Sequence, residues 1–243
     1  MIAVDNLAVE FSGDTLFSNV SFTINENDKI ALMGKNGAGK STMMKIIAGA
    51  QKPTRGNVRT PKEAVIAYLP QHLLTDDNCT VREEASKAFA QVLDMKSEMD
   101  RLNKELETRT DYESEAYMKI ISQVTELGEK YYAIEEINID EEVEKALRGL
   151  GFSRTDFERP TSEFSGGWRM RIELAKILLK KPDLILLDEP TNHVDIESVI
   201  WLENFLINKA KAVIVISHDK AFIDNITHRT IEVTMGRIYD YQA

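Results

Sequence analysis

The sequence predicts an α/β fold organised around a mainly parallel β-sheet. Three apolar runs, at residues 30–33, 184–187 and 212–216, have the length and composition of strands that are buried on both faces. The first run leads through a glycine-rich loop into the helix-like residues 43–48. A strand, a loop and a helix in this order form the unit from which parallel sheets are built.

The composition indicates a globular chain with one acidic segment. Of its 243 residues, 43% are hydrophobic and 29% are charged, and no apolar run approaches the ~20 residues of a membrane span. The N-terminus predicts a strand rather than a signal peptide. Cys79 is the only cysteine, which excludes an internal disulfide and favours a cytoplasmic location.

The net charge of −10 is unevenly distributed. Residues 76–145 contain 20 acidic and 9 basic side chains, whereas the rest of the chain contains 20 acidic and 21 basic ones. The acidity therefore belongs to an internal segment. The nearly neutral remainder argues against a broad nucleic-acid-binding surface on the core.

Residues 2–4, 7–11 and 20–24 predict short antiparallel strands, with a turn at 12–14. Phe11 stands just before that turn, where its ring could stack on a purine. Packing of Phe11 in the core is an equal alternative, and Phe17 is a weaker candidate for the stacking role.

Farther along, residues 53–57 predict a turn and residues 65–69 a strand that leads to Gln71. The Gln71 amide could reach a metal-bound water.

The glycine-rich loop fits the phosphate-binding pattern G-x-x-x-x-G-K-[ST]. Its glycines let successive backbone N–H groups face an anion, and the following helix adds its dipole. Lys40 supplies a charge for the outer phosphates, and the Ser41 hydroxyl can ligate Mg²⁺. A plain turn would require neither the lysine nor the hydroxyl. The residues expected at the phosphates are Gly34, Asn36, Gly37, Ala38, Gly39, Lys40, Ser41 and Thr42.

Residues 80–147 predict helices. Thr80 and Glu83 fit a capping box. Two series of apolar residues then recur at alternating spacings of three and four, with the polar residues 107–111 between them, and predict an antiparallel helical hairpin. Its charged faces are typical of solvated surface, and as a hypothesis its tip docks a partner. A third helix is expected at 141–147. The two series are Val92, Met95, Met99, Leu102 and Leu106, then Tyr117, Ile120, Val124, Leu127, Tyr131 and Ile134.

A second anion site is predicted where the next helix begins. Ser165 is placed as its N-cap, and Gly166 and Gly167 leave the first N–H groups of the helix accessible. Capping alone would explain the serine but not the paired glycines.

Three more candidate residues follow the other buried strands. In phosphoryl transfer, Asp188 would hold Mg²⁺ through water and Glu189 would polarise the attacking water, unless the two are merely solvated acids. His218 follows the strand at 212–216, so parallel strands would bring it to the same sheet edge, where it could contact a γ-phosphate. Residues 231–233 and 238–239 predict edge strands.

The phosphate loop, Gln71, Ser165-Gly166-Gly167, Asp188-Glu189 and His218 together resemble, in order, the motifs of the ATP-binding cassette (ABC) ATPases. The resemblance covers nearly the whole chain. It implies a P-loop NTPase cassette with a mainly parallel core sheet, an N-terminal antiparallel β subdomain and an inserted helical subdomain. Residues 1–75 and 165–243 would form the first two parts, and residues 76–164 the helical arm.

The resemblance also implies roles for individual residues, with ATP and Mg²⁺ as cofactors. Phe11 would stack on adenine, Gln71 and Asp188 would serve the metal with Ser41, and Glu189 and His218 would act in hydrolysis. The remaining assignments are residues 34–42 as Walker A, Ser165, Gly166 and Gly167 as the signature, and residues 192–195 as the D-loop, which places Asp195 at the nucleotide.

Trp168, residues 190–193 and the helical insert look like the first cassette of ABC-F proteins. These are soluble factors with two cassettes in one polypeptide that act on the ribosome, and they include translation factors and antibiotic-resistance proteins. In that family, ATP lies between the Walker A loop of one cassette and the signature of the other. The resemblance therefore implies a longer polypeptide with a second cassette, or a homodimer of this chain, and contact with ribosome and tRNA but with no membrane.

Two other classes of function are compatible with these motifs. One is the ATPase subunit of an ABC membrane transporter, against which the acidic hairpin and Trp168 argue. The other is a binding module that holds ATP as a structural ligand, against which Glu189 and His218 argue. A stacking aromatic ring accepts guanine as well as adenine, so the motifs leave the choice of nucleotide open.

Overall fold

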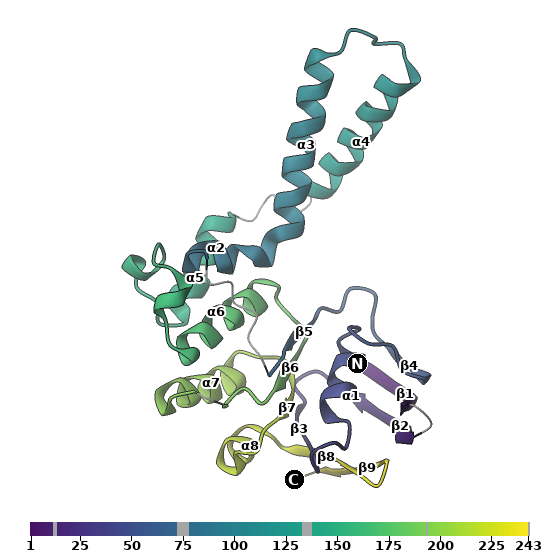
Figure 1. The fold of residues 1–243 in the computed structure, drawn as a ribbon, viewed down its shortest axis with the longest axis vertical. Helices are drawn as coiled ribbons and strands as arrows, with labels where there is room; N and C mark the ends of the chain where they lie inside the picture. The colour runs from purple at the N-terminus through teal and green to yellow at the C-terminus, as the bar shows by residue number, and fades with distance from the viewer. Residues whose placement is uncertain (12–13, 72–77, 133–137, 193, 243) are drawn as a thin grey trace.

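The computed structural model describes residues 1–11, 14–71, 78–132, 138–192 and 194–242. Two β-sheets form the body of the molecule, and a helical hairpin projects from it (Figure 1). One sheet has three strands in the order β2-β1-β4, and the other has six in the order β5-β6-β7-β3-β8-β9. The predicted α/β class is confirmed.

The six-stranded sheet is parallel except for β9, which runs antiparallel to β8. Every residue of β6 and β7 is buried, as their continuous apolar runs predict. The prediction of β8 as an edge strand is wrong, because β8 pairs with β3 on its other side. The strands are β3 (Lys29–Gly34), β5 (Ile66–Leu69), β6 (Leu184–Asp188), β7 (Ala212–Ile216), β8 (Arg229–Thr234) and β9 (Arg237–Gln242).

The three-stranded sheet is antiparallel and consists of β1 (Ile2–Phe11), β2 (Asp14–Ile24) and β4 (Arg55–Arg59). Two local predictions are corrected here. The expected short strands at 2–4 and 7–11 form one strand with register irregularities, because Asn6, at φ 46°, makes a local distortion rather than a turn. The turn expected at 53–57 is partly strand, because β1 offers a free edge that pairs with Arg55 onward.

The large sheet separates two hydrophobic cores. Leu184 and Leu186 of β6 join the core that contains α1 (Lys40–Ile47) and the three-stranded sheet. Ile185 and Leu187 join the core on the other face, since successive residues of a strand face opposite sides. That second core contains residues of α6 (Gly166–Leu179), α7 (Ile196–Asn208) and α8 (Lys220–Ile226), of which the last two helices were not predicted.

The inserted segment is helical, as predicted. It contains α2 (Val81–Ser86), α3 (Ala90–Thr108), α4 (Glu115–Tyr132) and α5 (Ile139–Gly149). The capping box of Thr80 and Glu83 is present at the start of α2. Both α2 and α5 pack against α6, which joins the insert to the body.

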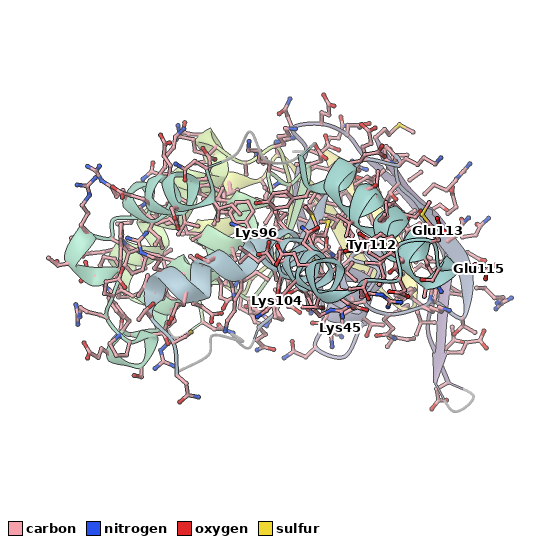
Figure 2. The ribbon with its side chains drawn as sticks, turned by 90° about the horizontal axis from the view of Figure 1, so that it is seen from above. Lys45, Lys96, Lys104, Tyr112, Glu113 and Glu115 are labelled. Atoms are coloured by element: carbon pink, nitrogen blue, oxygen red, sulfur yellow. The ribbon has the colours of Figure 1, made fainter. Side chains whose placement is uncertain are left out.

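The predicted hairpin, formed by α3 and α4, is here called the arm. It extends away from both sheets in Figure 1, and Figure 2 looks down on it, with Tyr112, Glu113 and Glu115 labelled near its tip. Met99, Leu102 and Ile120 are buried in its seam. Ile134, the last residue of the predicted series, lies outside the described residues. Among the described helices, none is long and apolar enough to cross a membrane.

Candidate active site

A cavity of about 530 Å³ lies where the carboxyl ends of β3, β5, β6 and β7 meet. Parallel strands bring their carboxyl ends to one edge of the sheet, and ligands of α/β proteins bind there. The cavity therefore gathers the residues that follow separate strands. Its lining consists of Leu16, Asn36, Gly37, Gly39, Lys40, Ser41, Thr42, Gln71, Asp188, Glu189, Asn192, Ile216 and His218.

The phosphate loop joins β3 to α1 along one wall of this cavity. Gly39 precedes the helix at φ 96°, and a Cβ there would lie 2.7 Å from the side chain of Leu16, so glycine is required. The helix begins at Lys40, and the N–H groups of its first turn have no carbonyl partner within the helix. An anion at this terminus would receive those hydrogen bonds and the favourable end of the helix dipole.

Lys40 is almost completely buried, with 9% of its surface exposed. Its Nζ donates hydrogen bonds to the carbonyl oxygens of Gly34 at 2.8 Å and Lys35 at 3.2 Å. The ammonium is therefore held across the loop, against the cavity wall. A phosphate entering the cavity would meet a positive charge whose position is already set.

Asp188, the last residue of β6, is 4% exposed and lines the same cavity as the Ser41 hydroxyl. Its Oδ2 accepts a hydrogen bond from the hydroxyl of Tyr68 at 3.3 Å. Burial, and secondarily the negative charge of Asp188, raise the pKa of Tyr68, so the phenol stays a hydrogen-bond donor. A buried carboxylate and a hydroxyl that face one cavity fit Mg²⁺, which takes oxygen ligands.

Glu189 adopts the left-handed backbone conformation, at φ 51°, and its N–H donates to the carbonyl oxygen of Ile216 at 2.9 Å. Its carboxylate is 7% exposed and lies against His218. The backbone N–H of His218 donates to Glu189 Oε2 at 3.3 Å, and His218 Nε2 lies 3.4 Å from Oε1. The structure thus brings together the two residues that the sequence predicts for hydrolysis.

Gln71 comes two residues after the end of β5, is exposed, and lines the cavity. The predicted position of this side chain at the sheet edge therefore agrees with the structure. Phe11 ends β1, but the position of its side chain lies outside the described residues. Adenine stacking by Phe11 stays a prediction.

The predicted second anion site lies at the start of α6. Ser165 is the N-cap residue there, but its side chain makes no capping hydrogen bond, so the expected cap is wrong in that respect. Close packing explains why residue 167 is a glycine, because a Cβ there would lie 2.5 Å from Asp195 Oδ2. The described residues that line the cavity do not include Ser165, Gly166, Gly167 or Asp195.

Asp195 is the N-cap of α7. Its Oδ1 accepts a hydrogen bond from the backbone N–H of Ser198, and its Oδ2 accepts one from the Ser198 hydroxyl, both at 2.9 Å. Both hydrogen bonds lower the pKa of Asp195, and the one from the backbone N–H of Ser198 contributes most. Because Gly167 packs directly on this cap, the first turn of α6 and the start of α7 form one unit.

Arg171 extends that unit to the helical insert. Its guanidinium lies 4.4 Å from the ring of Trp168 and 5.5 Å from that of Trp201. It donates to the carbonyl of Leu150 at 3.2 Å and to the Ser198 hydroxyl at 3.3 Å. Burial lowers the pKa of Arg171. A single side chain thus connects α6 with α7 and with the residue that follows α5.

Three residues at or beside the cavity were not predicted: Leu16, Ile216 and Tyr68. Leu16 and Ile216 are ordinary apolar strand residues, and nothing in their sequence context marks them. Tyr68 lies 120 positions from Asp188, and only the pairing of β5 with β6 brings the two together. The register of that pairing is the signal that would identify Tyr68, and local sequence patterns do not specify it.

The fold and this cavity define a P-loop nucleotide-binding cassette. A family model described as "ABC transporter" matches residues 17–192, which run from β2 to Asn192 at the cavity. The chain therefore belongs to the ABC transporter family, whose shared domain is the ATP-binding ATPase cassette.

Relatives with curated names agree with the predicted subfamily. The chain is 34% identical over 236 residues to "ABC transporter F family member 5" of Arabidopsis thaliana, an alignment that covers 97% of this chain and 34% of the relative. It is 35% identical over 221 residues to "Energy-dependent translational throttle protein EttA" of Escherichia coli K12. That alignment covers 91% of this chain and 39% of the relative. The resemblance to ABC-F proteins is confirmed, and the chain spans well under half the length of these relatives.

Solved structures confirm the fold. A nucleotide-free ATP-binding cassette from an ABC transporter superimposes with a TM-score of 0.71 at 21% identity, covering 100% of this chain and 91% of that one. A dimeric cassette in a post-hydrolysis state, bound to ADP and Pi, superimposes with a TM-score of 0.68 at 19% identity. That comparison covers 100% of this chain and 98% of the other.

Proposed function

We propose that this chain binds ATP with Mg²⁺ and hydrolyses it to ADP and phosphate. The observation that supports this most directly is the cavity that Lys40, Ser41, Asp188, Glu189 and His218 share. In that role, Lys40 and the first N–H groups of α1 bind the outer phosphates. Phosphoryl transfer depends mainly on such positioning and charge stabilisation.

Ser41 and Asp188 are the residues that would hold Mg²⁺, with Gln71 reaching it through water. When bound, the ion neutralises charge on the phosphates. Glu189 then orients the attacking water and accepts its proton on the carboxylate. His218, placed against that carboxylate, keeps it oriented and contacts the terminal phosphate.

We propose further that the working site forms between two cassettes. Ser165, Gly166, Gly167 and Asp195 lie outside the cavity of their own chain, at the linked starts of α6 and α7. A second cassette arranged head to tail would receive its nucleotide against this surface. The second cassette belongs to the same full-length polypeptide, and two copies of this chain can substitute for it.

For the whole protein, we propose that ATP-driven closure of the cassettes regulates binding to the ribosome, with contact to tRNA, in the cytoplasm. Two features support this: the relatives called "Energy-dependent translational throttle protein", and the arm, which projects from the body where a partner can reach it (Figure 1). Because this chain covers 39% of those relatives, the ribosomal role is proposed for the longer polypeptide.

The test is Glu189→Gln in the full-length protein. We expect phosphate release to fall by at least about 100-fold while ATP binding persists, because an amide cannot accept the proton. The trapped protein should sediment with ribosomes. Glu63→Gln, at an exposed position before β5, is the control.

Each alternative has its own outcome in this experiment. Normal turnover by Glu189→Gln contradicts the role of Glu189. Sedimentation with membranes and an integral membrane partner supports a transporter subunit instead. A wild-type protein that binds ATP and releases no phosphate supports the structural-ligand alternative.

A further inference from the structure

We propose that Tyr68 is a positioning residue that sets the orientation of the Asp188 carboxylate for the metal. This inference rests on the proposed Mg²⁺-ATP site and identifies a residue that serves it through Asp188. Its basis is the 3.3 Å hydrogen bond from the Tyr68 hydroxyl to Asp188 Oδ2, at the edge of the sheet where the cavity lies.

Sheet register explains how the two residues meet. β5 and β6 pair in parallel, and Tyr68 stands opposite Leu186. Paired residues point to the same face, and so do residues two apart on one strand, so Tyr68, Leu186 and Asp188 share a face. The tyrosine side chain is long enough to lean from the level of Leu186 to that of Asp188.

That face is the one covered by α1. Leu184 and Leu186 lie in the core with Met43 and Met44 of α1, and the Tyr68 ring packs against the same core. Ser41 belongs to the first turn of that helix. The pairing of β5 with β6 therefore places Tyr68 beside Asp188, which lines the cavity together with Ser41 of α1.

The hydrogen bond has a clear chemical consequence. Among the described residues, Tyr68 is the only one that donates a hydrogen bond to the Asp188 carboxylate, and it engages Oδ2 alone. Oδ1 is left to accept from a metal-bound water. Residues that fix the orientation of a metal-binding carboxylate typically contribute about tenfold or more to metal affinity.

The test uses Tyr68→Phe, which removes the hydroxyl and keeps the ring, in a Glu189→Gln background that prevents turnover. Binding of a fluorescent ATP analogue to this chain is titrated with EDTA present, and again against increasing Mg²⁺. We expect the half-saturating Mg²⁺ concentration to rise about tenfold, because Asp188 is no longer held. Affinity in EDTA should stay within about twofold, since packing is kept.

Two further variants separate positioning from a general structural effect. Tyr239→Phe removes a hydroxyl from the exposed strand β9 and should leave the Mg²⁺ titration unchanged. Once Asp188→Asn is introduced, adding Tyr68→Phe should produce no further shift, because both act on one carboxylate. If Tyr68→Phe still raised the half-saturating Mg²⁺ concentration about tenfold in the Asp188→Asn variant, the inference would be overturned.

The possible failures can be told apart. The role of Tyr68 is overturned if Tyr68→Phe leaves the Mg²⁺ dependence unchanged. It is also overturned if the variant loses as much affinity for the ATP analogue in EDTA as in Mg²⁺. Either result leaves the proposed function intact. If the parent chain binds the analogue with no response to Mg²⁺, both the proposed metal site and the inference fail.

Discussion

His218 contacts both oxygens of the Glu189 carboxylate, through its backbone N–H at 3.3 Å from Oε2 and through Nε2 at 3.4 Å from Oε1. The two residues follow neighbouring strands, β6 and β7, and Glu189 is 7% exposed whereas the His218 side chain is 67% exposed. The buried carboxylate is therefore fixed, and the exposed imidazole can reorient when ligand enters.

Replacing His218 with alanine should slow hydrolysis. The backbone bond to Glu189 would persist, but the imidazole that orients the carboxylate would be lost. We expect the rate of phosphate release to fall about 100-fold, with ATP affinity changed far less. Steady-state phosphate release by the full-length protein measures this. His228→Ala, between α8 and β8, is the control, and equal activity of the two variants would contradict the assigned role.

Gly167→Ala should destabilise the unit formed by the starts of α6 and α7. The added methyl group would lie 2.5 Å from Asp195 Oδ2 and 2.7 Å from the Ser198 hydroxyl, which breaks the cap of α7. We expect a loss of about 2 kcal/mol in the free energy of unfolding, measured with urea.

Gly149→Ala is a matched control for that substitution. A Cβ at Gly149, the last residue of α5, meets no atom within 4 Å. Alanine should therefore stabilise the helix by about 0.5 kcal/mol. If Gly167→Ala were as stable as Gly149→Ala, the close packing of Gly167 on Asp195 would be contradicted.

Glu84 should make the junction of α2 and α6 sensitive to acid. The side chain is 1% exposed and contacts Lys176 Nζ at 2.5 Å and Lys87 Nζ at 2.6 Å. Burial alone would raise the pKa of Glu84, but hydrogen bonds from Lys176 and Lys87 hold it below its ordinary value of 4.5. A lowered carboxyl pKa stabilises the fold above that ordinary value, and this stabilisation is lost as the pH falls below it.

We therefore expect Glu84→Gln to lose about 3 kcal/mol at pH 7, because Lys176 and Lys87 both lose the buried carboxylate and, among the described residues, Lys176 keeps only Glu173, at 2.9 Å. The difference from wild type should begin to shrink below about pH 4.5, where the carboxyl of the unfolded chain becomes protonated, and should shrink further as the pH falls through the lowered pKa of folded Glu84. Urea midpoints at pH 7 and pH 4 measure both effects. Glu63→Gln, an exposed position, should differ by less than about 0.5 kcal/mol at either pH. A constant difference across the pH range would refute the assignment.

Removing the tip of the arm should affect partner binding alone. The two helices of the arm pack chiefly on each other, so replacing residues 103–116 with a short glycine–serine linker leaves the body of the molecule intact. We expect ATP turnover by the full-length protein to be kept and its sedimentation with ribosomes to be lost. Unchanged ribosome binding and turnover would refute a docking role for the tip.

The parts of the fold that were predicted correctly depend on neighbours in the chain. The phosphate loop, the capping box of Thr80 and the apolar spacing within each helix of the arm depend on residues that lie near one another in the chain. The predictions that failed depend on distant partners. Residues 55–57 have turn character by themselves, yet they form a strand because β1 lies beside them. For the same reason, β8 is internal and not at an edge.

The site shows the same division. Local sequence patterns identify the side chains at the ends of the strands, namely Lys40, Gln71, Asp188, Glu189 and His218. Which of these side chains meet depends on the folded sheet, because contacts between strands follow from strand order and register. The pairing of β5 with β6 brings Tyr68 to Asp188, and the pairing of β6 with β7 brings His218 to Glu189. Backbone hydrogen bonds between strands set these positions, and they join residues that the chain separates widely.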